Sequence, residues 1–171
     1  MVSVTKLIDL LNKPALLGWA NKIGLKGINL KDYRKEVTSD GTNRHNQIEE
    51  FFKEGTLFDG VELLIKNIEL YEVLGCEVVV KNDFLSGRID LVLKKDELVY
   101  VCDFKRGKGI YLNTKLQLSA YKHMINADKI CYINLDSFDL IEIKIETEYY
   151  YKIIKHLYVI YDTLQTLNER L

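Results

Sequence analysis

The chain has 171 residues, of which 47% are hydrophobic and 29% are charged, and its formal net charge is −1 at pH 7. This length suits one domain with its own core, and the composition excludes a disordered chain. The cysteines Cys76, Cys102 and Cys131 are dispersed, which argues against a disulfide framework or a four-thiolate metal site. No apolar run approaches the roughly 20 residues of a membrane span, and residues 1–6 lack a secretory layout. We therefore expect a cytoplasmic protein without membrane contact.

Residues 1–74 are predicted to be mainly helical. Apolar spacing predicts helices over 3–12, 14–22, 42–53 and 61–74, with Gly75 ending the last of them. Residues 38–41 offer N-cap candidates for the third helix. His45 lies near the apolar stripe of that helix, where a lone histidine can be either a structural residue or a ligand.

Residues 75–145 are predicted to form the sheet core with one helix, and residues 147–171 a closing helix. The β-rich runs are 76–81, 87–93, 98–105, 129–135 and 140–145, and the helix within the core covers 114–126. This order predicts a single α/β domain over residues 1–171. Its mixed sheet of about five strands would be flanked by helices and preceded by a helical N-terminal region.

The second and third β-rich runs flank a charged turn of four residues and predict a β-hairpin. We expect Leu93 to lie opposite Leu98, which would set Asp90 diagonal to Asp103. Residues two apart on a strand share a face, so Asp90, Asp103 and Lys105 would project from one side of the sheet. Diagonal neighbours lie roughly 7–8 Å apart, which allows two carboxylates to converge on one cation.

This constellation suits metal-assisted phosphodiester hydrolysis. Carboxylate oxygens of Asp90 and Asp103 would hold Mg²⁺ or Mn²⁺, and Lys105 would orient water or neutralise charge in the transition state. Exposed Asp and Lys are also common on hairpins, so this stretch alone leaves an ordinary solvated hairpin as the alternative. Glu77, on the preceding strand, is either a third acid near the metal or a polar residue of an edge strand.

The same segment is locally basic. Residues 81–115 carry eight basic and five acidic residues, and the basic ones include Arg88, Arg106, Lys108 and Lys115. Such an excess can bind a phosphate backbone, or it can be an ordinary solvated face. The glycine-bearing loop around Lys108 lacks the Walker pattern, so nucleotide hydrolysis is not predicted.

Four motifs follow one another along the chain. They are Gly41-Thr42-Asn43-Arg44-His45, Gly87-Arg88-Ile89-Asp90, Asp103-Phe104-Lys105 and Gln117-Leu118-Ser119-Ala120-Tyr121. Together they resemble the PD-(D/E)xK nuclease superfamily, over roughly residues 38–124. The resemblance is to its RecB-like exonuclease branch, which includes phage-encoded, Cas4-like and mitochondrial genome-maintenance exonucleases.

The resemblance implies a restriction-endonuclease-like core and a defined ligand set. His45, Asp90 and Asp103 would be ligands of Mg²⁺ or Mn²⁺, and the backbone carbonyl of Phe104 would add another. Lys105 would be the catalytic lysine.

Gln117 and Tyr121 lie one turn apart on the helix predicted over 114–126. They could be surface residues, but the resemblance implies that they position the DNA strand near the scissile phosphate. The chain departs from the family pattern at Ile89, which stands where the first motif of the superfamily has proline. Its three dispersed cysteines do not match the iron–sulfur cluster of Cas4-like members, so none is expected.

The function that the resemblance implies is a divalent-metal-dependent deoxyribonuclease. We expect an exonuclease that acts on single-stranded DNA or free ends in phage or bacterial DNA processing, recombination or repair. The chain has no helicase motifs, so unwinding would come from a helicase or recombination protein. The alternatives are a structure-specific or restriction-like endonuclease and a non-catalytic DNA-binding or assembly subunit. RNA as substrate and homo-oligomerisation are left open.

Overall fold

The structure is a computed structural model that describes residues 1–11, 14–107 and 110–169, with the backbone alone at 14–16, 34 and 36–41. Contacts divide the chain into two compact units. The larger unit comprises Met1–Leu10 and Asp59–Leu171, and the smaller unit is Leu11–Phe58. Across the described ranges, no helix has the length and apolarity needed to cross a bilayer.

The larger unit is built around a mixed six-stranded sheet, which confirms the predicted α/β class. The strand order is β1–β3–β4–β5–β6, and β2 also pairs with β3. β3 is antiparallel to β2 and β4, whereas β4 and β5 are parallel. The elements are β1 (Val2–Ser3), α1 (Val4–Ile8), α4 (Val61–Ile68), β2 (Glu72–Lys81), β3 (Leu85–Lys95), β4 (Leu98–Lys105), α5 (Leu112–Ile125), β5 (Lys129–Asn134), β6 (Leu140–Glu142) and α6 (Thr147–Asn168).

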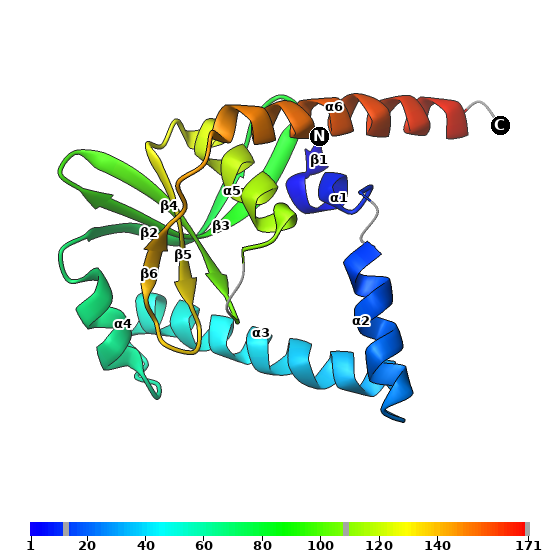
Figure 1. Cartoon of the computed structure of the whole chain (residues 1–171). Coiled ribbons are helices and arrows are strands. Elements are labelled where there is room, and N and C mark those ends of the chain that lie inside the picture. Colours follow the sequence, from blue (N-terminus) through cyan, green and yellow to red (C-terminus); the bar gives the residue numbers. More distant parts are fainter. Residues whose placement is uncertain (12–13, 108–109, 170–171) are drawn as a thin grey trace. The chain divides into compact units, whose positions relative to one another are not determined.

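The core of this unit lies between the sheet and α5. Leu91 and Leu93 on β3, Cys102 on β4, and Leu116 and Leu118 on α5 are fully buried. Figure 1 shows α5 lying against the sheet and α6 lying over α5. α5, which follows β4 in the chain, is therefore held close to β4.

The hairpin turn is tighter than the sequence predicted. Asp96 and Glu97 form a two-residue loop with φ values of 49° and 64°, as in a type I′ turn. The register sets Leu93 opposite Tyr100, so the predicted pairing of Leu93 with Leu98 is wrong. The shift is two residues, which keeps every side chain on its predicted face.

The predicted helix over 61–74 is also too long. α4 ends at Ile68, and the chain is already in β2 from Glu72. Gly75 pairs with Val92 within the sheet, next to an irregularity of register after Val73. The closing helix ends at Asn168, and residues 170–171 of its predicted range lie outside the described residues.

The smaller unit is a helical hairpin of α2 (Pro14–Leu25) and α3 (Leu30–Glu54). Trp19 and Tyr33 join the two helices, with ring centroids 5.9 Å apart. The prediction that a helix starts after residues 38–41 is wrong. α3 starts earlier because the Asn29 side chain accepts hydrogen bonds from the N–H groups of Lys31 and Asp32.

Candidate active site

The β3–β4 ladder stops where the two predicted acids begin. The last pair is Leu91 with Cys102, and one further step places Asp90 opposite Asp103. There the N–H of Phe104 donates to Oδ2 of Asp90 at 2.7 Å, so a side-chain carboxylate accepts the bond. The two acids are directly opposed rather than diagonal, which corrects the predicted geometry and brings them closer.

Both acids are buried, which is costly for ionised carboxylates. Asp90 is 8% exposed and Asp103 is 3% exposed. Burial raises the pKa of Asp90 well above its usual range, and the charges of Asp103 and Glu77 raise it further. The Phe104 N–H and the Lys105 ammonium oppose this shift. A bound cation would relieve the same repulsion.

Lys105 lies on the same face of β4 as Asp103. Its Nζ is 2.6 Å from Oδ2 of Asp103, and its side chain is partly exposed. This contact is an ion pair without hydrogen-bond geometry. The sequence therefore placed Lys105 correctly beside the acids, and its ammonium has access to solvent.

Glu77 extends the pair of acids into a row across three strands. Its neighbours Cys76 and Val78 pair with Leu91 and Ile89, so Glu77 lies opposite Asp90. A carboxylate oxygen of Glu77 lies within 4.8 Å of one of Asp90, close enough for both to bind one metal ion.

The backbone of Glu77 is itself unusual. Its φ is +54°, a left-handed conformation that costs energy in a non-glycine residue and that tends to cluster at functional sites. The side chain is 6% exposed and forms an ion pair with Arg88. Glu77 is thus a buried acid of the row rather than a solvated edge residue, although a metal-binding role stays a prediction.

Tyr121 from α5 lies against β3 beside the acids. Its side chain is 3% exposed, and the phenol oxygen hydrogen-bonds with the backbone of Arg88 and the side chain of Gln117. Burial raises the pKa of Tyr121, and the charges of Asp90 and Asp103 add to the shift, so the phenol stays protonated. Gln117 and Tyr121 are thus bonded to each other on α5 as their spacing predicted, and their role in positioning DNA stays a prediction.

Gly87 leaves the space that the ring of Tyr121 occupies. A Cβ on Gly87 would lie 2.7 Å from the phenol oxygen and 2.8 Å from Cζ, inside van der Waals contact. Only glycine lets the ring approach the backbone of β3 this closely. The sequence presented Gly87 as part of a motif, but its contact with a residue 34 positions later could not be read from spacing.

The loop after Lys105 is fastened by the turn between β5 and β6. Nε of Arg106 lies 3.0 Å from Oδ1 of Asp136, and Nδ2 of Asn134 donates to the carbonyl of Gly107 at 3.0 Å. Neither Asn134 nor Asp136 was predicted as a site residue. Asn134 and Asp136 lie near the loop because β5 runs parallel to β4 and ends beside it. The spacing of residues along the sequence does not show this tertiary contact.

The other residues that were predicted to contact nucleic acid differ in their exposure to solvent. Arg88 is 64% exposed despite its ion pair, and Lys115 is half-buried in the first turn of α5. Lys108 lies outside the described residues. His45 belongs to α3 in the smaller unit, which is described by itself, and its role as a ligand stays a prediction.

Two of the three cysteines meet within the sheet. Cys102 on β4 is paired in register with Cys131 on β5, and both are buried. Burial raises the pKa of the Cys102 thiol well above its usual range, so the group behaves as a small apolar residue. Cys76 is half-buried on β2.

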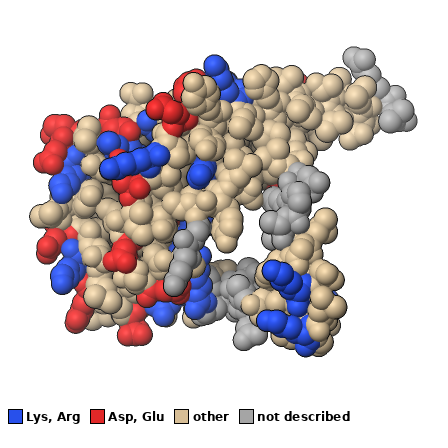
Figure 2. All heavy atoms as spheres, in the orientation of Figure 1, with Lys and Arg blue, Asp and Glu red and all other residues tan. Residues whose placement is uncertain are grey.

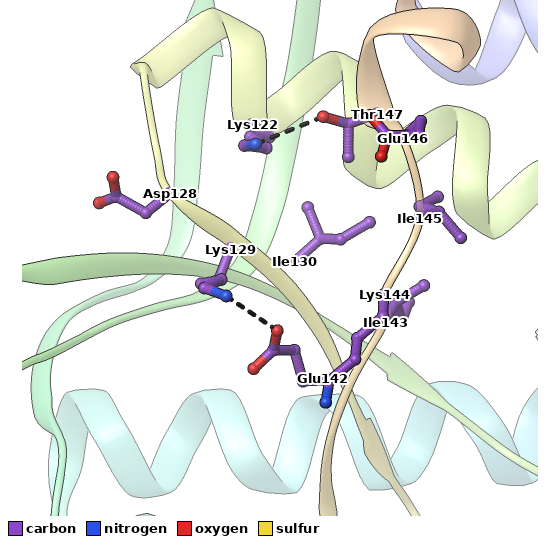
Figure 3. A pocket seen from close by; sticks show the side chains of 10 residues that line it. All are labelled: Lys122, Asp128, Lys129, Ile130, Glu142, Ile143, Lys144, Ile145, Glu146 and Thr147. Atoms are coloured by element: carbon purple, nitrogen blue, oxygen red, sulfur yellow. Dashed lines mark hydrogen bonds and ion pairs between the residues drawn. The ribbon is translucent and has the colours of Figure 1, made fainter.

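A separate surface hollow of about 460 Å³ lies between the end of α5, β5 and the start of α6. Figure 3 shows that Lys129 within it is paired with Glu142, and Lys122 with Thr147. No residue of the predicted site lines this hollow. Its charges are of both signs, so it gives no preference for a phosphate group.

Comparison with protein-family models and with curated proteins finds no match. Among solved structures, the chain is similar to one described as "Crystal structure of SSO0001", with a TM-score of 0.48 and 16% sequence identity. The similarity covers 92% of this chain and 75% of that chain. A likeness at this level carries no argument about activity, so the candidate function rests on the site itself.

Proposed function

We propose that the chain is a divalent-metal-dependent deoxyribonuclease, most simply an exonuclease of phage or bacterial DNA processing, recombination or repair. One observation carries this proposal: Asp90 and Asp103 are buried and opposed at the open end of the β3–β4 ladder, with the Lys105 ammonium 2.6 Å from Asp103. Buried acids of this kind are arranged for a cation rather than for stability.

The acid row would hold the metal ion. Asp90, Asp103 and Glu77 offer hard carboxylate oxygens, which suit Mg²⁺ or Mn²⁺. The N–H of Phe104 points to Asp90, and the N–H and C=O of one strand residue face the same neighbour, so its carbonyl faces the site too. We include His45 as a further ligand on the strength of its motif. Bound metal would supply a Lewis acid and lower the pKa of a coordinated water.

The remaining side chains would act on the substrate. Lys105 has an ammonium that can orient the attacking water or stabilise the charge that develops on the phosphate. Tyr121 and Gln117 would position the strand from the α5 side, since they are hydrogen-bonded to each other and the charges of Asp90 and Asp103 act on the phenol. Arg88 would contact a neighbouring phosphate with its exposed guanidinium.

The proposed fold family is the restriction-endonuclease-like core of the PD-(D/E)xK superfamily. Its support is the chain order: an antiparallel β2–β3–β4 meander, then α5, then β5 parallel to β4. The acid-x-lysine motif falls on β4 and the Gln-x-x-x-Tyr motif on α5, which packs against β4. This agreement between motif and element is what we would require of a member.

The experiment is digestion of end-labelled linear and circular single-stranded DNA with Mg²⁺, Mn²⁺ or EDTA. Asp103→Asn is the control variant, because it keeps the size of the side chain and removes its charge. We expect metal-dependent loss of the linear strand by the wild type and no loss with the variant. RNA of the same sequence serves as a parallel substrate.

The other outcomes separate the alternatives. Cutting of the circle would replace the exonuclease with an endonuclease. Cleavage by Asp103→Asn at the wild-type rate would overturn the assigned site. No cleavage by the wild type with either metal, together with retained DNA binding, would identify a non-catalytic binding subunit.

A further inference from the structure

Four lysines gather where α2 turns into α3. They are Lys22 in the last turn of α2, Lys26 just after that helix, and Lys31 and Lys35 near the start of α3, and we call them the lysine cluster. All four side chains are exposed. Residues 22–35 contain five basic residues and one acidic residue, although the whole chain carries a net charge of −1. In Figure 2, blue atoms gather over this helical hairpin without red atoms among them.

Folding does not account for the whole cluster. Lys22 and Lys26 complement the negative end of the α2 dipole, and this would be a sufficient structural reason for them. Lys31 is the second residue of α3, where the positive end of a helix disfavours a cation. Among the described residues, no ion pair or hydrogen bond holds any of the four ammonium groups.

The geometry of the hairpin holds the cluster together. Lys22 follows Trp19 by three residues and so lies on its side of α2, and Lys26 directly follows the last residue of the helix. Lys31 and Lys35 are one turn apart on α3, on either side of Tyr33 in the sequence. Lys26 and Lys31 are separated by only four residues, and the Trp19–Tyr33 contact at 5.9 Å holds the two helices together, so the four lysines gather at this end of the hairpin.

We propose that the lysine cluster is a nucleic-acid contact surface that binds the phosphate backbone of single-stranded DNA, independently of the metal. This inference rests on the proposed function for the choice of DNA as the polyanion. Closely spaced ammonium groups release counterions from a phosphate backbone, which makes such binding strong at low salt and independent of sequence. The cluster would therefore hold the substrate, while the acid row cuts it.

The test uses the full-length protein in EDTA, so that binding is measured without cleavage. Anisotropy of a fluorescein-labelled single strand is recorded over a series of salt concentrations. The test variant carries Lys22→Gln, Lys26→Gln, Lys31→Gln and Lys35→Gln. The matched control carries Lys66→Gln, Lys144→Gln, Lys152→Gln and Lys155→Gln, which are exposed lysines of the larger unit and change the net charge equally.

We expect the cluster variant to bind at least about tenfold more weakly at low salt. The slope of log affinity against log salt should become shallower by up to about 3, since each lost phosphate contact on a single strand contributes roughly 0.7. The control variant should keep the affinity within about twofold and leave the slope nearly unchanged. Equal losses in both variants would overturn the inference, because net charge alone would then explain binding.

The single tryptophan gives a second readout inside the same unit. DNA should change the emission of Trp19 in the wild type and in the control, because the rings lie next to the lysine cluster. The cluster variant should keep the wild-type emission spectrum without DNA, which shows that the hairpin is folded, and should lose the change on adding DNA. A full emission change in that variant would overturn the inference.

Failure of this inference is distinguishable from failure of the proposed function. A wild type that cleaves with Mn²⁺, together with a cluster variant that binds like the wild type, would overturn the lysine cluster alone. Vesicles of phosphatidylserine serve as the competing polyanion. If the four substitutions abolish vesicle binding and leave DNA binding unchanged, the surface is a membrane contact and the proposal is wrong.

Discussion

The acid row of the sheet and the lysine cluster of the helical hairpin place charge in opposite ways. In the row, Glu77, Asp90 and Asp103 are buried, opposed across three strands and closely engaged with N–H and cationic groups. The four lysines are exposed and form no described ion pair. Chemistry on a phosphodiester requires preorganised charge in a low dielectric, whereas holding a polyanion requires only density of charge at the surface.

The largest expected effect separates the two regions by function. Lys105→Ala should lower the cleavage rate by at least about 100-fold, because the ammonium that stabilises developing charge is lost. DNA affinity in EDTA should stay within about threefold of the wild type, since the lysine cluster is intact. Single-turnover cleavage and anisotropy measure the two quantities on one preparation.

The reciprocal variant completes this comparison. The cluster variant should lose affinity but cut at the wild-type rate once DNA is saturating. If Lys105→Ala instead cleaved normally, the lysine would be an ordinary partner of Asp103 and the assigned chemistry would be wrong.

The next-largest effect concerns the contact between Gly87 and the ring of Tyr121. Gly87→Ala should destabilise the protein by about 1–3 kcal/mol, because the new Cβ overlaps the phenol ring. In a Tyr121→Ala background the same substitution should cost little, whereas in a Tyr121→Phe background the cost should remain, since the ring is still present. Urea denaturation of the six proteins measures this coupling.

Gly24→Ala is the control that separates the loss of the Tyr121 contact from the general effect of replacing a glycine. At Gly24 an added Cβ meets nothing within 4 Å, so Gly24→Ala should be neutral or stabilising. An equal cost of Gly87→Ala in all three backgrounds would mean that the backbone, and not Tyr121, requires glycine at this position.

How far the sequence predicted the site follows from these same contacts. The faces of Asp90, Asp103 and Lys105 followed from the period of two along a strand, and this survived a two-residue error of register. The contact of Gly87 with Tyr121 could not be predicted, because it joins a strand to a helix that reaches it only through tertiary packing.

The fold was predictable to a similar depth. The strand predicted over 76–81 starts too late, because apolar spacing at Val73 and Leu74 fits a helix as well as a strand, and β2 begins at Glu72. The start of α3 was misplaced because several residues suit an N-cap, and only the structure selects Asn29. The lysine cluster was missed because α3 was predicted to start only after residue 41, so Lys31 and Lys35 were not placed on a helix that follows α2.

A smaller effect is expected from the buried charge of Asp90. Its folded pKa is raised above the unfolded value, so its contribution to stability is present at acid pH and is lost as pH rises through the folded pKa. Asp90→Asn removes this ionisation and keeps an oxygen for the Phe104 N–H. The metal-free variant should therefore be more stable than the wild type at neutral pH.

Thermal unfolding in EDTA from pH 4 to pH 8, with and without Mn²⁺, measures the difference and relates it to metal binding. The advantage of Asp90→Asn should shrink toward acid pH, and Mn²⁺ should stabilise the wild type but not the variant. A variant that is less stable than the wild type at neutral pH would mean that Asp90 contributes to folding rather than to a site.

The smallest effect lies in the helical hairpin. Asn29→Ala should cost about 1 kcal/mol, because the N–H groups of Lys31 and Asp32 lose their capping oxygen. Fraying of the first turn of α3 would loosen Lys31 and Lys35 while leaving the number of charges unchanged. Hydrogen exchange should rise at residues 31–33 and stay unchanged in β3 and β4, where the acid row is held by the sheet.

DNA affinity gives the sharper consequence of this loosening. If phosphate binding depends on charge density alone, Asn29→Ala should lower affinity by no more than about twofold and leave the salt slope unchanged. Asn29→Ser, which keeps a capping oxygen, is the matched control. A loss as large as that of the four-lysine variant would mean that the lysine cluster, like the acid row, works only in a fixed geometry, and the contrast between the two regions would be wrong.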